Sequence, residues 1–338
     1  MNNVVNADGS YQLGRYTQAF ERANMLDARM PYVPRFLQKL RLREWQAFQI
    51  TNDRFFAMIA LYNAKKFGLV QFILYDIQKN EKLRYERQVL PSSLTLPDSL
   101  YKQGAGYRSK GFHLQTYCDL ERGRIEIKAS IDGVGKMPPL LAHFIGYCPT
   151  DKIQPIAVCL PFDDLRAMYS YKCLMPVQGQ VQIDDQRHYF SSHTSAMIID
   201  DHKGYYPSPT HYDWATGMGY DEQNNLIGFN LTDNQARQPH LYNENCLWYK
   251  GITHLLPPVK MNQPNGSENE WLISDEQGKV NLSFSPVAHT YFNKNLLFMR
   301  SKYHSPYGYF NGYLTNKDGE RVPIQKLFGV CEDFYLKI

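Results

Sequence analysis

Short β-rich runs, separated by turn signals, recur along almost the whole chain and limit its fold more than any other feature. Runs at 42–50, 54–62 and 67–76 are separated by the turn sequences TND and NAKK. Strands of this length at spacings of about 12 residues indicate an antiparallel meander. Further runs of the same kind complete the first half, at 83–89, 111–118, 122–130, 156–162, 168–176 and 179–183.

The second half repeats this rhythm. In one of its runs, Val280, Leu282 and Phe284 alternate with polar residues, which predicts a half-buried strand. No helical repeat lies between the runs, so a parallel sheet with crossover helices is not expected. Sequential strands with short turns close into up-and-down barrels, which removes exposed edges. The runs of this half lie at 226–232, 241–249, 251–256, 259–263, 270–275, 279–286, 296–303, 307–314 and 322–336.

The chain length of 338 residues predicts two domains. We expect an N-terminal extension at 1–40, a first β-barrel half at 41–190 and a second at 191–338. Short helices are predicted at 17–26 and 191–199. The His-, Asp- and Tyr-rich segment 184–219 lacks clean alternation and predicts a long connection, whose core at 191–220 joins the halves.

Composition excludes several classes of function. A net charge of +4 without a run of Lys and Arg argues against nucleic-acid binding. The six cysteines form no C-x-x-C pair, so we expect free, buried thiols in a reducing compartment and no zinc or redox site. No apolar run approaches the roughly 20 residues of a membrane helix, and no secretory signal begins the chain. We therefore expect a soluble, cytoplasmic protein without stable membrane insertion, and the sequence does not define its oligomeric state.

The densest polar cluster is DDHKGYYP at 200–207. A Lys–Asp pair held in a barrel mouth suits acid–base chemistry, because partial burial shifts both pKa values. This hypothesis makes Asp200 and Lys203 catalytic candidates and places Asp201 and Tyr205 beside a ligand. The alternative, favoured by the residues alone, is a solvated turn.

Lys172 lies inside an apolar strand pattern, and a buried lysine needs a carboxylate partner. Asp200, Asp201 and Glu244 are the candidates. The remaining candidates are polar residues and tryptophans of the second half, which either line a ligand cavity or hold a loop and fill the core: Trp214, Asn230, Asn243, Glu244, Asn245 and Trp248. No nucleotide, dinucleotide or metal motif is present, so no cofactor and no metal site is predicted.

Several blocks resemble the domain-of-unknown-function family 2804. They include DDHKGYYP, YDWATGMGYDEQNNLIGFNLTDN, YNENCLWYKGITHLLPPVKM and YGYFNGYLTNKDGERVPIQKLFGVCED. More distantly, the chain resembles the lipocalin-like carotenoid hydratase group. This resemblance implies two calycin-like antiparallel β-barrels with a ligand pocket at or between them, and it assigns no catalytic role to any residue.

Three hypotheses for function follow. The first is binding of an apolar, lipid- or isoprenoid-like small molecule in a barrel pocket. The second is a cofactor-independent hydratase, isomerase or cyclase, in which Asp200 or Glu244 moves a proton and Lys203 or Lys172 tunes the acid. An interaction module ranks third, because it requires a large exposed apolar patch.

Overall fold

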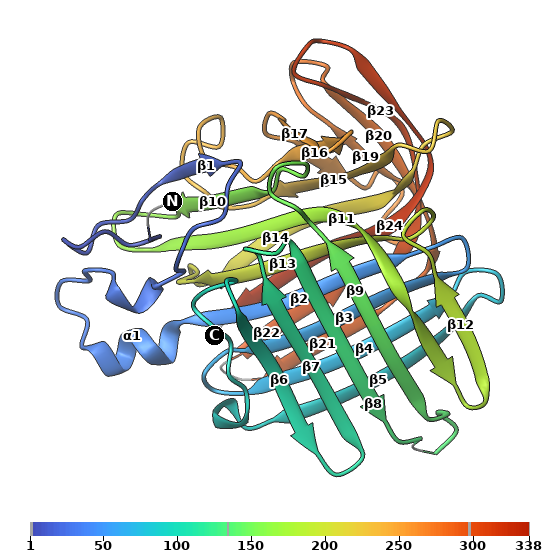
Figure 1. Ribbon diagram of the computed structural model, residues 1–338. Coiled ribbons are helices and arrows are strands. Elements are labelled where there is room, and N and C mark those ends of the chain that lie inside the picture. The colour runs from blue at the N-terminus through green and yellow to red at the C-terminus, as the bar shows by residue number, and fades with distance from the viewer. Residues whose placement is uncertain (1–2, 134, 297–298, 338) are drawn as a thin grey trace. The chain divides into compact units, whose positions relative to one another are not determined.

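Strands account for most of the structure, a computed structural model that describes residues 3–133, 135–296 and 299–337 (Figure 1). Contacts between residues divide the chain into two units. The first unit comprises Met1–Gln12, Tyr16–Cys159 and Met168–Tyr205, and the second comprises Leu13–Arg15, Leu160–Ala167 and Tyr206–Ile338. Each unit contains most of one antiparallel sheet.

The sheet of the first unit has the strand order β5-β4-β3-β2-β13-β11-β9-β8-β7-β6, with β1, β10 and β12 paired beside it. Its strands are β1 (Gly14–Tyr16), β2 (Arg43–Thr51), β3 (Phe55–Asn63), β4 (Gly68–Asp76), β5 (Glu81–Val89), β6 (Gln103–Ser109), β7 (Phe112–Asp119), β8 (Arg124–Ile131), β9 (Leu140–Tyr147), β10 (Ile156–Pro161), β11 (Ala167–Ile183), β12 (Gln186–Phe190) and β13 (Ala196–Gly204).

The second sheet has the order β17-β16-β15-β14-β24-β23-β20-β19-β18, with β22 paired to β24 and β21 to β22. Its strands are β14 (Thr210–Tyr220), β15 (Leu226–Asp233), β16 (Cys246–Tyr249), β17 (Ile252–Leu255), β18 (Lys260–Asn262), β19 (Trp271–Ser274), β20 (Val280–Ala288), β21 (Tyr291–Leu296), β22 (Met299–His304), β23 (Tyr307–Thr315) and β24 (Arg321–Lys337).

The first sheet curls until strands that are distant in its order meet. β13, β11, β9 and β8 separate β2 from β7 in the sheet. Nevertheless, the hydroxyl of Thr116 on β7 donates a hydrogen bond of 2.5 Å to Gln46 Oε1 on β2. The edges also approach each other, because Arg87 Nη1 on β5 lies 3.4 Å from Ser109 Oγ on β6. These contacts across the concave face give the half-barrel curvature that the sequence rhythm predicts.

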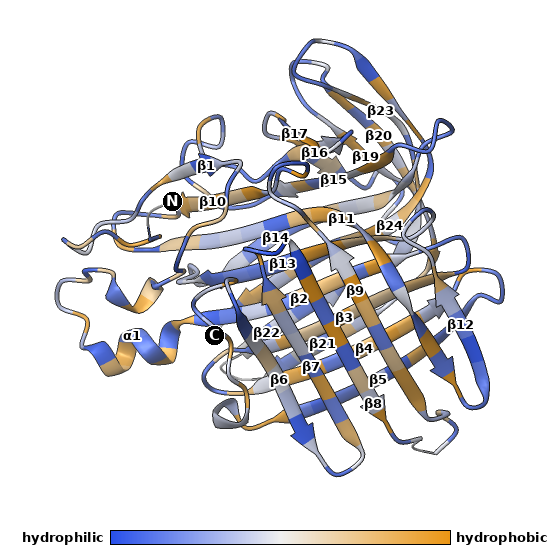
Figure 2. Ribbon diagram, viewed as in Figure 1, coloured by the Kyte–Doolittle hydropathy of each residue, from blue (hydrophilic) through white to orange (hydrophobic). Residues whose placement is uncertain are grey.

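An aromatic and aliphatic core fills the concave face of the second sheet. Phe310 packs against Phe229 and Phe284, with ring centroids 4.9 Å and 4.6 Å apart. Val280, Leu282 and Phe284 are buried while the residues between them are not, so the predicted alternation in β20 is confirmed. The hydropathy colours show the same two-residue period in strands of both units (Figure 2). All six cysteines are buried and free, as expected.

Both helix predictions are wrong, and the prediction of a long connection at 184–219 is also wrong. Residues 17–24 are not helical, and the neighbouring helices are η1 (Met25–Asp27) and α1 (Arg35–Arg41). The predicted helix at 191–199 is a turn followed by β13, and the segment 184–219 holds β12, β13 and most of β14. The polar residues of β13 have partners on neighbouring strands, which local propensity does not register.

The contact-based units also differ from the predicted boundaries. β13 is paired with β2 and β11, so 196–204 belongs to the first sheet and not to a second half beginning at 191. The N-terminal residues are not grouped as a separate extension, because most of them fall within the first unit, where the amide of Ala23 donates to the carbonyl oxygen of Asp98 at 2.6 Å. The predicted strand 296–303 corresponds to β22, and its residues Leu297 and Phe298 lie outside the described residues.

A few other elements complete the description. A second short 3-10 helix, η2, spans Pro91–Ser93. Among the described residues, no helix has the length and apolar character needed to cross a membrane.

Close packing between β14 and β24 predicts a strong effect of one methyl group. A Cβ on Gly329 would lie 2.0 Å from the backbone oxygen of Thr216, which cannot move without shifting β14. We expect Gly329→Ala to lower the free energy of unfolding by about 2–3 kcal/mol, measured by urea denaturation. Gly219→Ala is the matched control, because its new methyl would meet only the flexible side chain of Leu327 at 3.1 Å. Equal stability of the two variants would contradict this account.

Candidate functional site

The face of the first sheet that carries Asp200 and His202 is the strongest candidate site. These residues are two apart on β13 and therefore point to the same side. On β11, Lys172 lies opposite Asp200 and Ser170 lies opposite His202. On β2, Trp45 is the partner of His202. Three neighbouring strands thus place side chains of complementary chemistry in two adjacent rows.

Lys172, Asp200 and His202 form a compact hydrogen-bonded group, which we call the buried triad. Lys172 Nζ donates to Asp200 Oδ1 at 3.0 Å and lies 2.9 Å from His202 Nε2. His202 Nε2 is 3.3 Å from the same oxygen of Asp200. Ser170 Oγ accepts from Lys172 Nζ at 3.2 Å. Of the three carboxylates predicted as partners of Lys172, Asp200 is therefore the one in contact.

Burial makes the buried triad chemically unusual. Lys172 has only 2% of its surface exposed, and Asp200 has 7%. The indole of Trp45 stacks on the His202 ring, with centroids 4.3 Å apart and an angle of 8° between the planes. A buried ammonium and a buried carboxylate persist only when they compensate each other. Donation from Lys172 Nζ to His202 Nε2 requires that this nitrogen carry no proton, and all three side chains are of types that accept or release a proton.

Small and half-buried side chains adjoin the buried triad. Ala47 on β2 lies opposite Asp200, and Ala60 on β3 lies opposite Ala47. We call these two alanines the alanine floor. Trp45 and Tyr62 border it on one side, with ring centroids 6.1 Å apart. All four residues are partly accessible, whereas the buried triad is not.

Gln49 borders the alanine floor on the other side. It has the same orientation as Ala47 because the two are two residues apart on β2. The side chain is 1% exposed. Its Oε1 atom has no hydrogen-bond partner among the described residues. A buried acceptor without a partner costs about 1–3 kcal/mol, so a group that donates to it would be bound favourably.

The opposite face of β13 holds a separate set of charges. Lys203 Nζ donates to Glu44 Oε1 and to Asp98 Oδ1, both at 2.8 Å. Asp201 accepts from Gln46 Nε2 at 3.1 Å, and burial raises the pKa of Asp201 to about 7. Lys203 therefore does not face Asp200, and its contacts are those of a buried structural ion pair.

Tyr205 follows β13 and is also tied to the backbone. Its hydroxyl donates to the carbonyl oxygen of Met25 at 3.3 Å. This contact joins the end of β13 to the N-terminal segment of the same unit. The predicted ligand contacts of Tyr205 and Asp201 remain predictions.

The candidate residues of the second unit form a connected polar network. Trp214 Nε1 donates to Asn230 Oδ1 at 2.7 Å, and Asn230 Nδ2 donates to the carbonyl oxygen of Glu244 at 2.8 Å. The carboxylate of Glu244 accepts from the hydroxyl of Thr232 at 2.8 Å. These bonds fix the segment that leads into β16.

Asn243 and Asn245 also bond mainly to the backbone. Asn245 Oδ1 accepts from the amide of Thr232 at 2.7 Å, and Asn245 Nδ2 donates to the carbonyl of Pro257 at 2.9 Å. Asn243 Oδ1 accepts from the amide of Asn245 at 2.9 Å. Trp248 is buried in β16, and its Nε1 has no partner among the described residues. The contacts of both asparagines are those expected for residues that hold a loop.

Sequence reasoning missed a buried carboxylate on β24. Tyr303 donates to Glu332 Oε1 at 2.6 Å, and Tyr212 donates to Glu332 Oε2 at 3.4 Å. Burial, together with the charge of Glu332, raises the pKa of Tyr303 well above its ordinary value. The residues lie on three separate strands, so only the pairing of β14 and β22 with β24 brings them together.

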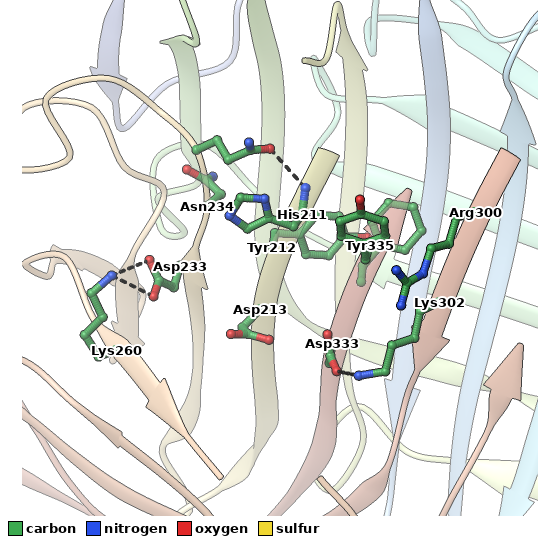
Figure 3. Close-up of a pocket in the computed structure, with 12 residues that line it drawn as sticks. His211, Tyr212, Asp213, Asp233, Asn234, Lys260, Arg300, Lys302, Asp333 and Tyr335 are labelled. Atoms are coloured by element: carbon green, nitrogen blue, oxygen red, sulfur yellow. Dashed lines mark hydrogen bonds and ion pairs between the residues drawn. The ribbon is translucent and has the colours of Figure 1, made fainter. Parts of the chain in front are cut away.

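A pocket of about 670 Å³ is lined by residues of the second sheet (Figure 3). Asp213 on β14 is the direct partner of Asp233 on β15 and of Asp333 on β24. Lys260 pairs with Asp233, and Lys302 pairs with Asp333 at 2.7 Å. Figure 3 shows Asp213 between these two pairs. Like charges placed directly opposite each other on neighbouring strands are unfavourable.

Burial and the neighbouring carboxylates raise the pKa of Asp213 to about 7. The rest of the lining is mixed rather than apolar, because Arg300 packs over the ring of Tyr335 at 5.7 Å and His211 is exposed nearby. No group of three His, Cys, Asp or Glu side chains in the described part of the chain is arranged to hold a metal ion.

A model of the family DUF2804, a domain of unknown function, matches residues 2–337. The chain belongs to this family. The resemblance recognised in the sequence blocks is therefore confirmed over almost the full length. No curated protein matches the chain.

Solved structures with the same fold are distant in sequence. CghA in complex with Sch210972 is 8% identical, with 88% of each chain covered and a TM-score of 0.53. Kievitone hydratase from Nectria haematococca is 9% identical, with 96% of this chain and 98% of that chain covered and a TM-score of 0.52. A putative AttH from Nitrosomonas europaea is 9% identical over 88% of this chain and 93% of that chain, with a TM-score of 0.51. These similarities establish the lipocalin-like, calycin-type fold.

Because the pKa of Asp213 is raised, replacing this carboxylate with a neutral side chain should increase the stability of the protein by an amount that depends on pH. Because the folded pKa of about 7 exceeds the ordinary value of 3.8, the folded protein binds this proton more tightly than the unfolded chain. The stability that Asp213 contributes therefore falls as the pH rises toward 7. We expect Asp213→Asn to stabilise the protein by about 1 kcal/mol at pH 8 and by less at pH 5.

Thermal unfolding at both pH values measures this difference. Asp318→Asn, in an exposed turn of the same unit, is the control and should be neutral at both. A gain from Asp213→Asn that does not change with pH would show that repulsion among the three aspartates is not its cause.

Proposed function

We propose that this protein is a cofactor-independent enzyme that moves a proton to or from an apolar substrate, in the class of hydratases, isomerases and cyclases. The observation that carries the proposal is the buried triad. Lys172, Asp200 and His202 place an ammonium, a carboxylate and an imidazole within hydrogen-bond distance of one another. Titratable groups in such surroundings are typical of catalytic sites.

The cost of burying the triad supports a functional role. Removing two charges from water costs several kcal/mol per ion, and a hydrophobic pair of similar volume is often equally stable. Lys172 is 2% exposed and lies on the face of the sheet opposite the first unit's own core. Fold stability alone therefore does not explain why a lysine is buried there. These groups suit a proton relay, since each side-chain type can gain or lose a proton.

We place the proposed substrate-binding site, called the substrate seat below, at the alanine floor. Ala47 and Ala60 present only methyl groups beside Asp200, and the rings of Trp45 and Tyr62 offer an apolar wall. Gln49 Oε1 would accept a hydrogen bond from a substrate hydroxyl, which would satisfy this otherwise unpaired atom. The proposed substrate is thus an apolar molecule that carries at least one hydroxyl group.

The proposed reaction balances without a cofactor. In a hydration, the triad transfers one proton to a carbon of a double bond. Water then adds to the neighbouring carbon and returns a proton to the triad, so the net change is the addition of one water. Exclusion of bulk water around His202 strengthens these transfers. In an isomerisation or cyclisation the same proton leaves and returns without water.

Two relatives with the same fold support this class. One is named kievitone hydratase, and another is CghA in a crystal structure with Sch210972. Plain binding of an apolar ligand is the second candidate. It is favoured by the stacked Trp45 and would need no proton transfer. The core of the second sheet is filled by side chains such as Trp271 and Phe284, so the proposed site is placed on the first sheet.

Replacement of Asp200 tests the proposed catalytic role. Kievitone and a panel of prenylated phenols and isoprenoid alcohols are incubated with the protein in isotopically labelled water, and labelled products are detected by mass spectrometry. We expect Asp200→Asn to lower turnover by about 100-fold or more. It also leaves Lys172 buried without its anion, which costs about 3–5 kcal/mol of stability.

The double variant Lys172→Met/Asp200→Leu keeps this test free of folding defects. It removes both charges and is expected to recover most of the stability while remaining inactive. Asp132→Asn, an exposed carboxylate of the same unit, is the control with full activity. Turnover that survives in the double variant would refute the acid–base role. A bound ligand without turnover in the native protein would favour plain binding.

Gln49 gives a second test, in which stability and affinity change in opposite directions. Gln49→Leu removes the unsatisfied acceptor, so we expect the free energy of unfolding to rise by about 1 kcal/mol. The same change removes the proposed contact to the substrate hydroxyl, so KM should rise about tenfold with little change in kcat.

The control for this variant is Gln178→Leu. Gln178 is exposed and bonds the hydroxyl of Tyr147, so its loss should leave both KM and stability nearly unchanged. An unchanged KM for Gln49→Leu would exclude Gln49 from the substrate seat without touching the role of the buried triad.

A further inference from the structure

An exposed cationic and apolar surface surrounds α1, far along the chain from the buried triad. Residues 28–43, ARMPYVPRFLQKLRLR, contain no Asp or Glu. They do contain five cationic residues, which are Arg29, Arg35, Lys39, Arg41 and Arg43. The surplus of positive charge is therefore local, because the whole chain has a net charge of only +4.

Three large apolar side chains project from the same segment. Tyr32 is fully exposed, Phe36 is 65% exposed and Leu40 is 44% exposed. Phe36 and Leu40 are four residues apart on α1, so they lie on one side of the helix. Figure 2 shows apolar and polar residues side by side on this short helix. We call Tyr32, Phe36 and Leu40, with their exposed cationic neighbours, the α1 surface.

The other side of α1 is anchored to the first unit. Gln38 is buried and donates from Nε2 to the carbonyl oxygen of Val33 at 2.9 Å. Leu42, directly after the helix, is 2% exposed. The segment of α1 therefore has a buried side, while Phe36 and Leu40 remain in solvent.

Three cations of the α1 surface, Arg35, Lys39 and Arg41, are exposed and are at most weakly paired with anions of the described residues. Arg35 Nη2 lies 3.5 Å from Asp27, but both side chains are largely exposed, and such a pair contributes little. Lys39 and Arg41 form no ion pair among the described residues and are exposed. Their charge is available to an external anionic surface.

We propose that the α1 surface docks the protein on an anionic lipid surface. Aromatic side chains favour the boundary between water and acyl chains, so Tyr32 and Phe36 suit insertion at this depth. Burying three apolar side chains contributes only a small free energy of binding. Each nearby cation adds electrostatic attraction to the anionic headgroups. Together these terms give reversible peripheral attachment, with no segment crossing the bilayer.

The combination of features favours lipid over other anionic partners. A nucleic-acid surface needs cations that track phosphates, and three projecting apolar side chains would oppose it. An acidic protein would need a shaped complement, whereas a bilayer accepts apolar tips flanked by cations in any lateral position. The proposal does not depend on the acid–base chemistry of the buried triad, although apolar substrates concentrate in membranes.

Vesicle sedimentation with the full chain tests the proposal. Vesicles of phosphatidylcholine alone are compared with vesicles that also contain phosphatidylglycerol. We expect binding only to the anionic vesicles, with weakening at high salt. Phe36→Ser/Leu40→Ser should lower binding about tenfold or more, and Lys39→Glu/Arg41→Glu should lower it at least as strongly.

Matched controls place the same changes elsewhere on the first unit. Leu90→Ser/Tyr189→Ser alters two side chains that are 74% and 71% exposed, and it should bind like the native protein. Lys110→Glu/Lys152→Glu makes the same change in charge at exposed positions away from α1. Absence of vesicle binding overturns the proposal. Equal binding to neutral vesicles, or equal loss in the controls, also overturns it, as does a dimer that Phe36→Ser/Leu40→Ser abolishes.

Discussion

Strand β13 is the element on which the first unit and its candidate site depend. It is hydrogen-bonded to β2 on one side and to β11 on the other, so it joins the two halves of the sheet. All nine of its residues are buried, including the four consecutive ionisable residues at 200–203. Side chains alternate along a strand, so this run must place two of them on each face. Each pair therefore needs its own partners.

The two faces of β13 meet that need in different ways. On one face, Lys203 meets two carboxylates and Asp201 meets an amide, and these partners come from β2 and a nearby loop. On the other face, Asp200 and His202 share a single ammonium from β11. The first arrangement is that of a structural ion pair. The second brings together three side chains whose chemistry allows proton exchange.

Sequence patterns predicted the fold class because alternation is a local property. The run around Val280 predicts its strand correctly, and family blocks indicated the calycin-like pair of sheets. The same reasoning failed at 191–204, because a fully buried strand with polar residues on both faces shows no alternation. It also could not place His202 against Trp45, since that contact depends on the register between β2 and β13. The partnership of Lys172 with a carboxylate was predictable from burial, but only the register selects Asp200.

The partners of a buried polar side chain help to separate a structural role from a chemical one. In the second unit, Asn230 and Asn245 bond to backbone groups that would otherwise be unsatisfied, so their amides complete the fold. An amide in such a position has no proton to exchange at ordinary pH. The contacts of the buried triad that define its geometry are between side chains, and all three members can change protonation state. Gln49 differs from the other amides because its oxygen is buried and unpaired beside the alanine floor. Three proton-exchanging side chains in mutual contact, with an unpaired amide oxygen beside them, are the strongest physical reason to seek a substrate there.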